Sequence, residues 1–150
     1  MSNEIIFDAR SLTRAYGKGP RAVRALESVD LRVHRGERLG VVGESGSGKS
    51  TLIRLLAALD TPTSGTVTFE GRQVTGLKER DLGFLRRRVQ IVFQDPRSSL
   101  DPRMKVRRII SEPLRSPLIR AELAQLDPDA RVREMMEAVG LDYADADRYP

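Results

Sequence analysis

The sequence of 150 residues contains no cysteine, a single histidine, and aromatic residues at only 5% of positions. The absence of cysteine excludes disulfide bonds, thiolate metal sites and cysteine nucleophiles. A long apolar run is also missing, since the most apolar segment, residues 52–59, is interrupted by Arg54. We therefore expect no membrane-spanning helix. Because the amino terminus lacks the basic and apolar regions of a signal peptide, a cytoplasmic location is the default expectation.

One motif stands out in what remains, a glycine-rich loop that matches the phosphate-binding pattern GxxxxGK[ST] in full. The match comprises Gly43, Glu44, Ser45, Gly46, Ser47, Gly48, Lys49, Ser50 and Thr51. An apolar run at residues 39–42 precedes the loop and is typical of a buried strand, and leucines at positions 52, 55, 56 and 59 follow it on one face of a helix. These flanks favour a phosphate-binding loop over the alternative, a glycine-rich turn that happens to precede a helix.

The residue types in this loop match the chemistry of a nucleoside triphosphate. Glycines adopt positive φ angles easily, so the backbone can fold into a nest of N–H groups around phosphate oxygens. The helix that begins near Lys49 adds its unpaired N–H groups and the positive end of its dipole. We expect Lys49 to reach the β- and γ-phosphates and the Ser50 hydroxyl to ligate Mg²⁺.

The net charge of +5 is concentrated in one segment. Residues 97–120 contain seven basic and two acidic residues, and the rest of the chain is neutral. Such a patch can bind nucleic acid, an anionic membrane or an acidic protein, or it can simply face solvent. Nucleic acid is not expected, because the segment has no aromatic residue that could stack on bases. A solvated face and a protein-partner surface both remain open.

The distribution of apolar residues predicts an α/β protein. Short β-type runs occupy residues 5–9, 29–33 and 66–69, with turns at 34–37 and 61–65. The alternating runs fit an antiparallel edge sheet, whereas a strand followed closely by a helix fits a parallel α/β core. A further β-type run covers residues 89–93.

The character of the sequence then changes to helical. Asp127 is a predicted N-cap with Pro128 in the first turn, and Gly140 is expected to end the helix. The apolar residues expected on its buried face are Val132, Met135, Met136 and Val139.

Gln94 directly follows the predicted strand at residues 89–93. It therefore lies at the carboxyl end of a strand, where open α/β sheets bind their ligands. A side-chain amide at this point can ligate Mg²⁺ and contact an attacking water, whereas the alternative is an ordinary polar loop residue.

From about residue 4 to residue 150, the sequence resembles the ATP-binding subunit of an ABC transporter. The resemblance is to the oligopeptide, dipeptide and nickel importers in particular. It rests on the glycine-rich loop and on three segments after it: Phe-Gln-Asp-Pro at 93–96, Ser-Leu-Asp-Pro-Arg-Met at 99–104 and Glu-Pro-Leu at 112–114. The fold that it implies is a P-loop NTPase nucleotide-binding domain of ABC type, with an antiparallel edge sheet, a parallel α/β core and the start of a helical subdomain.

The resemblance also implies roles for particular residues. Gln94 corresponds to the Q-loop glutamine, which would act in catalysis with Lys49. Tyr16, in Arg-Ala-Tyr-Gly at 14–17, corresponds to the A-loop aromatic that stacks on adenine; a tyrosine at the edge of a turn is the alternative. Residues 97–120 belong to the helical subdomain that meets the permease.

The implied function is ATP-driven import of peptides or a related small solute, with ATP and Mg²⁺ bound at the loop. Two ATP-binding subunits pair head to tail in this family and contact transmembrane permease subunits. They act indirectly with an extracytoplasmic solute-binding protein. The expected location is thus the inner face of the cell membrane. The alternatives are an ABC-type ATPase with another cargo or a non-transport role, and a nucleotide-binding module that does not hydrolyse ATP.

Several motifs of that family do not occur in the sequence. It has no LSGGQ-type signature, no Walker B strand ending in Asp-Glu and no switch histidine, since His34 precedes the loop. The final Tyr149-Pro150 matches a pair that closely precedes the signature in the family. We therefore expect the amino-terminal portion of such a subunit, inactive by itself, with residues 1–95 from the catalytic core and 96–150 from the helical subdomain.

Overall fold

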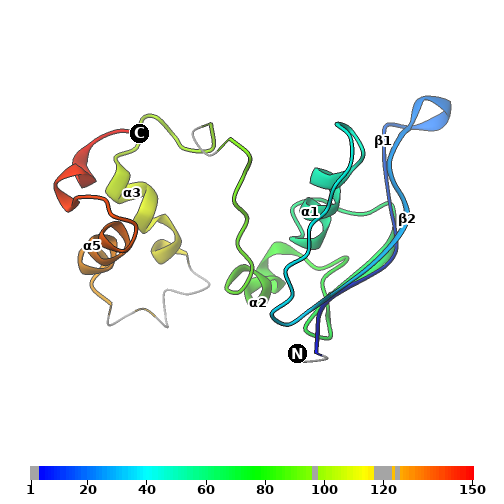
Figure 1. Cartoon of the computed structure of the whole chain (residues 1–150), viewed down its shortest axis with the longest axis horizontal. Helices are drawn as coiled ribbons and strands as arrows, with labels where there is room; N and C mark the ends of the chain where they lie inside the picture. The colour runs from blue at the N-terminus through cyan, green and yellow to red at the C-terminus, as the bar shows by residue number, and fades with distance from the viewer. Residues whose placement is uncertain (1–3, 96–97, 117–122, 124–125) are drawn as a thin grey trace. The chain divides into compact units, whose positions relative to one another are not determined.

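The computed structural model describes residues 4–95, 98–116, 123 and 126–150. The chain divides into two compact units, residues 1–90 and 91–150, and each has its own core (Figure 1). The expected division into residues 1–95 and 96–150 concerns functional subdomains and stays a prediction.

The first unit contains a four-stranded antiparallel sheet with the order β2-β1-β3-β4. Its strands are β1 (Ile5–Tyr16), β2 (Val23–His34), β3 (Ser64–Phe69) and β4 (Arg72–Gln73). A 3-10 turn at Gly19–Arg21 lies between β1 and β2, which run side by side as a long hairpin in Figure 1. All three β-type runs expected at residues 5–9, 29–33 and 66–69 lie in these strands, so this part of the prediction is confirmed.

Helix α1 (Lys49–Leu56) packs on the sheet through Leu52 and Leu55. A 3-10 turn (Glu79–Asp81) and the short helix α2 (Gly83–Arg86) complete the unit. The buried core residues are Ala9, Leu12, Leu26, Leu52, Leu55, Val67, Phe69, Val74, Leu82 and Leu85. The expected position of Leu59 on the buried helix face is wrong, because α1 ends at Leu56 and the chain turns at Ala58, where φ is +51°. Leu59 is consequently exposed.

The apolar runs at residues 39–42 and 89–93 were expected to be strands, but the structure assigns neither to a strand. Val42 is 93% exposed and Val92 is 85% exposed. A strand forms only when a neighbour pairs with its N–H and C=O groups, and no strand among the described residues pairs with these runs. An apolar run by itself therefore does not make a strand here.

The second unit is helical. Its elements are α3 (Val106–Ser111), a 3-10 turn (Glu112–Arg115), α5 (Pro128–Ala138) and a 3-10 helix (Tyr143–Asp147). Val132, Met136 and Ala146 form its buried core, against which Val106, Ile110 and Tyr143 pack. In the part of the chain that is described, no helix has the length and apolar character needed to cross a membrane.

Helix α5 has the ends that the sequence predicts. The Asp127 side chain accepts a hydrogen bond from the backbone N–H of Asp129 at 3.0 Å. At the other end Gly140 has a φ of +76°, and the N–H groups of Gly140 and Leu141 bond back into the last turn, as in a Schellman motif. The expected buried face is only half correct. Val132 and Met136 are buried, whereas Met135 and Val139 are exposed because only a narrow stripe of α5 meets its neighbours.

Candidate nucleotide-binding site

The glycine-rich loop of residues 43–51 opens directly into α1, whose first residue is Lys49. Gly46 and Gly48 have φ angles of +81° and +91°. A Cβ atom at Gly48 would lie 2.3 Å from the carbonyl oxygen of Ala25 in β2, so only glycine fits at this point. Gly48 is the N-cap of α1, and no side chain caps the first N–H groups of the helix. These N–H groups can therefore bind an anion.

Lys49 is held inside this loop. Its ammonium group donates to the carbonyl oxygens of Gly43 and Glu44, at 2.8 and 2.7 Å, and to Oγ of Ser47 at 3.3 Å. These bonds keep the positive charge of Lys49 over the loop. Gly43 and Glu44 thus hold the lysine through their backbone carbonyls. Ser45 lies at the exposed turn of the loop.

A cavity of about 140 Å³ opens beside the start of α1. Its lining residues are Ala25, Gly46, Ser47, Gly48, Lys49, Ser50 and Thr51. Six of the nine residues predicted for the loop therefore meet around one cavity, with two positive-φ glycines, a lysine and three hydroxyl groups. This donor-rich lining suits a phosphate group.

Tyr16 ends strand β1, opposite Val23 of β2. Its hydroxyl group donates to Oδ2 of Asp60 at 2.7 Å, and the guanidinium carbon of Arg14 lies 4.5 Å from its ring centroid. The loop touches the same stretch of β2, since Gly48 lies against Ala25 and Leu26. The structure thus brings Tyr16 and the phosphate loop to one end of the β1–β2 hairpin.

Asp60 and Arg14 are residues of this region that sequence reasoning missed. Arg14 precedes Tyr16 by two positions on the same strand, so the period of two places both on one face and could have revealed it. No local signal points to Asp60, because it reaches Tyr16 only through the fold. Burial acts to raise the pKa of Asp60, but hydrogen bonds from Tyr16 and Thr61 and the charge of Arg14 outweigh it and lower that pKa. Asp60 is therefore ionised at neutral pH.

Gln94 belongs to the second unit, where residues 94 and 95 form an exposed bend. Its expected contact with Mg²⁺ and water stays a prediction.

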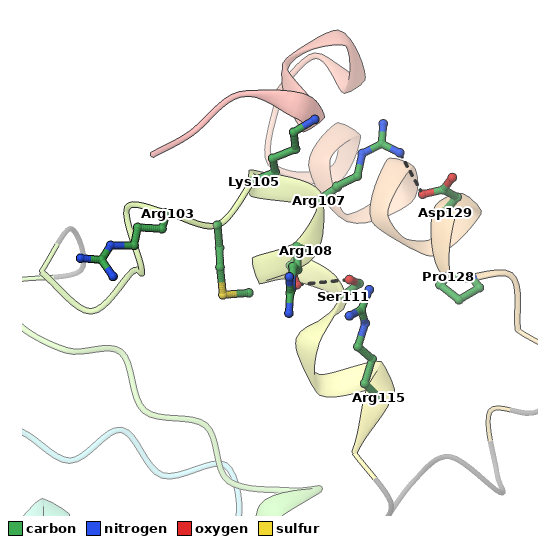
Figure 2. A pocket seen from close by; sticks show the side chains of 9 residues that line it. Arg103, Lys105, Arg107, Arg108, Ser111, Arg115, Pro128 and Asp129 are labelled. Carbon is green, nitrogen blue, oxygen red and sulfur yellow. Dashed lines mark hydrogen bonds and ion pairs between the residues drawn. The ribbon is translucent and has the colours of Figure 1, made fainter.

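The basic segment forms a second cavity, of about 340 Å³, in the helical unit (Figure 2). Its lining residues are Arg103, Met104, Lys105, Arg107, Arg108, Ser111, Arg115, Pro128 and Asp129. Arg107 pairs with Asp129 and Asp147, and Lys105 with Asp147. Arg103, Arg108 and Arg115 form no ion pair with any described residue, so the cavity keeps a positive surplus. Arg97 and Arg120, also counted in the basic segment, lie outside the described residues.

A glycine loop that closes on a helix N-terminus, with a lysine held over it and a sheet behind it, defines the first unit as part of a phosphate-loop nucleotide-binding protein. Comparison with known sequences makes the assignment specific. The profile of the family described as ABC transporter matches residues 26–149, and the chain belongs to this family.

Named relatives agree with the resemblance found in the sequence. The chain is 42% identical to the di/tripeptide transport ATP-binding protein DppF of Pseudomonas aeruginosa, over 98% of this chain and 46% of that protein. It is 48% identical to the probable peptide ABC transporter ATP-binding protein y4tS of Sinorhizobium fredii, over 85% of this chain and 35% of that protein. The chain thus spans less than half the length of either relative.

A solved structure confirms the fold class. The chain is similar to the ATP-binding cassette MJ0796 in a dimeric post-hydrolysis state bound to ADP and Pi, with a TM-score of 0.78 and 27% identity. The match covers 97% of this chain and 62% of that one.

Proposed function

We propose that this chain supplies the ATP-binding part of a subunit that couples ATP hydrolysis to the import of peptides or a related small solute. The observation that carries the proposal is the Lys49-centred loop at the start of α1. It occurs in a chain whose relatives are named as peptide-transport ATP-binding proteins.

The loop residues suit the triphosphate of ATP. Lys49 would turn from the Gly43 and Glu44 carbonyls toward the β- and γ-phosphates, and the backbone N–H groups after Gly48 would hold the phosphate oxygens. Tyr16 would stack on the adenine ring, which is worth about 1–3 kcal/mol per base in nucleic-acid complexes. Gly43, Glu44, Ser45, Gly46, Ser47, Gly48, Lys49, Ser50 and Thr51 are all assigned to this site.

Mg²⁺ fits the oxygen ligands that the loop offers. The Ser50 hydroxyl lies in the first turn of α1, and no cluster of three acidic or histidine residues that could hold a metal exists among the described residues. Mg²⁺ commonly binds through one or two protein oxygens together with substrate phosphates, so this donor set suits an ion that arrives with ATP. When bound, the ion neutralises phosphate charge. Ser50 is the proposed ligand, with Gln94 as a second.

For hydrolysis, we assign Lys49 to stabilise charge on the γ-phosphoryl oxygens and Gln94 to orient the attacking water. The 150 residues include no Walker B or signature motif. We therefore expect them to bind ATP without steady turnover.

Two kinds of partner follow from this function. A second ATP-binding subunit would pair head to tail, as the dimeric state of the MJ0796 cassette suggests. Permease subunits would contact residues 94–120 and hold the protein at the inner face of the membrane, with an extracytoplasmic solute-binding protein acting indirectly. Arg103, Arg108 and Arg115 have no ion-pair partner among the described residues, and their positive charge suits acidic groups on such a permease.

Calorimetric titration of the chain with ATP and Mg²⁺ tests the nucleotide site. Hydrogen bonds to charged groups contribute about 1.5–3 kcal/mol, so Lys49→Ala should weaken binding by roughly tenfold or more. Lys78→Ala, an exposed lysine remote from the loop in sequence, is the matched control and should bind as the wild type does. Equal affinity in Lys49→Ala and wild type would contradict the assignment.

Cross-linking tests the permease surface, and the absence of native cysteine makes single-cysteine variants simple to build. Cysteine at Arg103, Arg108 or Arg115 should cross-link to a membrane subunit in the assembled transporter. Cysteine at the exposed Glu27, on the sheet of the first unit, is the control and should not. Exclusive capture of DNA or RNA by the basic segment would contradict the proposal.

A further inference from the structure

We infer that Asp60 and Arg14 are positioning residues that hold the Tyr16 ring in one orientation, so that a nucleobase can stack on only one of its faces. The inference rests on the proposed function, because it concerns the same nucleotide site. It adds two residues to that site and assigns them a role in recognising the base rather than the phosphates.

The Asp60 carboxylate accepts hydrogen bonds from both Arg14 and Tyr16. Its Oδ2 accepts the Tyr16 hydroxyl at 2.7 Å and Nε of Arg14 at 3.0 Å. Its Oδ1 lies 2.7 Å from the second guanidinium nitrogen of Arg14. The carboxylate therefore binds Arg14 in a two-point fork and Tyr16 at the same time. Such charge-assisted bonds are shorter and stronger than neutral ones.

The Arg14–Asp60 ion pair is largely shielded from solvent. The Arg14 and Asp60 side chains are only 23% and 18% exposed. An ion pair with this little exposure is screened less by solvent and salt than a surface pair. Tyr16 itself is 39% exposed, so the aromatic ring protrudes from an otherwise protected cluster.

Arg14 lies over one of the two faces of the Tyr16 ring. The guanidinium carbon of Arg14 lies 4.5 Å from the Tyr16 ring centroid, which is cation–π distance and covers one face. A base can stack only on the opposite face. The result would be a layered arrangement of guanidinium, phenol and base, with the tyrosine fixed before the nucleotide arrives.

Asp60 is itself anchored by the backbone of the next residue. Its Oδ1 accepts the N–H of Thr61 at 2.7 Å. Three residues on, Thr63 accepts the N–H of Ala15 at 3.0 Å and donates its own N–H to the carbonyl of Thr13 at 2.8 Å. Because this segment follows helix α1, the Asp60 contact ties the base-stacking ring to the helix that begins with Lys49.

The experiment compares two ligands, ATP with Mg²⁺ and the base-free inorganic tripolyphosphate with Mg²⁺. Fixing one side chain in advance saves the ordering cost of binding, which corresponds to roughly two- to tenfold in affinity. Asp60→Ala should therefore weaken ATP by this factor and leave tripolyphosphate unchanged. In a Tyr16→Ala background the same substitution should have no further effect on ATP.

Asp30→Ala and Tyr16→Phe serve as a control and as a second test. Asp30→Ala is the matched control, since Asp30 also anchors β1, through the N–H of Ser11, but does not touch Tyr16. It should leave the affinity for both ligands unchanged. Tyr16→Phe removes only the hydroxyl donor and keeps the Arg14–Asp60 pair. It should weaken ATP selectively, by less than Tyr16→Ala does, even if Asp60→Ala does not fold.

Two results together would overturn the inference: Asp60→Ala weakens both ligands, and Tyr16→Phe binds ATP as the wild type does. Asp60 would then have only a general structural role. Unchanged ATP affinity in Asp60→Ala, with a clear loss in Tyr16→Ala, would also overturn it while leaving the proposed nucleotide site standing. The proposed function is tested separately. It would fail if Lys49→Ala bound tripolyphosphate as tightly as the wild type does.

Discussion

Gly48 is the point at which the phosphate loop packs directly against strand β2. Gly46 and Gly48 both have positive φ angles, so each relieves the strain that a side chain would cause there. They differ in their surroundings. A Cβ at Gly48 would meet the Ala25 carbonyl at 2.3 Å, whereas a Cβ at Gly46 would meet no atom within 4 Å.

Comparing alanine at these two glycines should separate backbone strain from steric contact. Gly46→Ala should lower stability only through the strain of the left-handed conformation, which costs about 1–2 kcal/mol for a residue with a Cβ. Gly48→Ala adds a collision with backbone, worth about 1–3 kcal/mol more, and should also weaken ATP binding as the loop moves from β2. Urea unfolding and ATP titration of both variants provide the measurement. Equal losses at the two positions would show that the contact with Ala25 is unimportant.

At the scale of elements, helix α1 depends on a side chain from α2. Arg86 donates to the carbonyl oxygens of Ala57 and Ala58, at 2.5 and 3.0 Å, directly after the end of α1. It also donates to both carboxylate oxygens of Glu79, at 2.8 Å, and the pKa of Glu79 is lowered by this hydrogen bond. Arg86 is thus a cation at the negative end of the helix dipole and a partner for the two carbonyls that directly follow α1.

Arg86→Ala should destabilise the first unit by about 1.5–3 kcal/mol, the value typical of hydrogen bonds to a charged group. Arg86→Lys should recover only part of this, because an ammonium group cannot reproduce the planar fork. Arg80→Ala is the control, since Arg80 is 76% exposed and pairs with Asp81 only at 3.8 Å. Denaturant midpoints measure all three. If Arg86→Ala were as stable as the wild type, the carbonyls of Ala57 and Ala58 would not need Arg86 as their hydrogen-bond donor.

At the scale of the whole molecule, carboxylates in the first unit link its stability to pH. The pKa values of five of them are lowered in the folded state: Glu4, Asp8, Glu37, Asp60 and Glu79. For four of these the leading cause is a hydrogen bond from arginine or from a backbone N–H group. For Asp60, burial opposes the shift and is outweighed by its donors.

Acid should therefore lower the stability of this unit. Groups with a lowered pKa bind fewer protons when folded, so their stabilisation is present at neutral pH. It is lost as the pH falls through the ordinary values of 4.5 for Glu and 3.8 for Asp toward the folded values. Urea midpoints at pH 7 and about pH 3 should show lower stability in acid. The Glu79→Gln variant should show a smaller drop. A midpoint that rose in acid would contradict this account.

Features that depend on neighbours in sequence were determined by the sequence itself. The glycine turn that leads into α1 at Lys49, the Asp127 cap and the Gly140 end of α5 need only a few consecutive residues, and the structure has these local features as predicted. The strands around residues 5–9, 29–33 and 66–69 also follow from their alternating pattern.

The tertiary structure alone decided features that need partners distant in sequence. Residues 39–42 are as apolar as a strand but pair with none among the described residues, and Leu59 is exposed because a turn at Ala58 ends the helix face. The Tyr16–Asp60 bond joins residues 44 positions apart, and Arg86 reaches Ala57 and Ala58, just after α1, across 29 and 28 positions. Local propensity acts over a few residues, whereas strand pairing, burial and ion pairing depend on which segments the folded chain brings together.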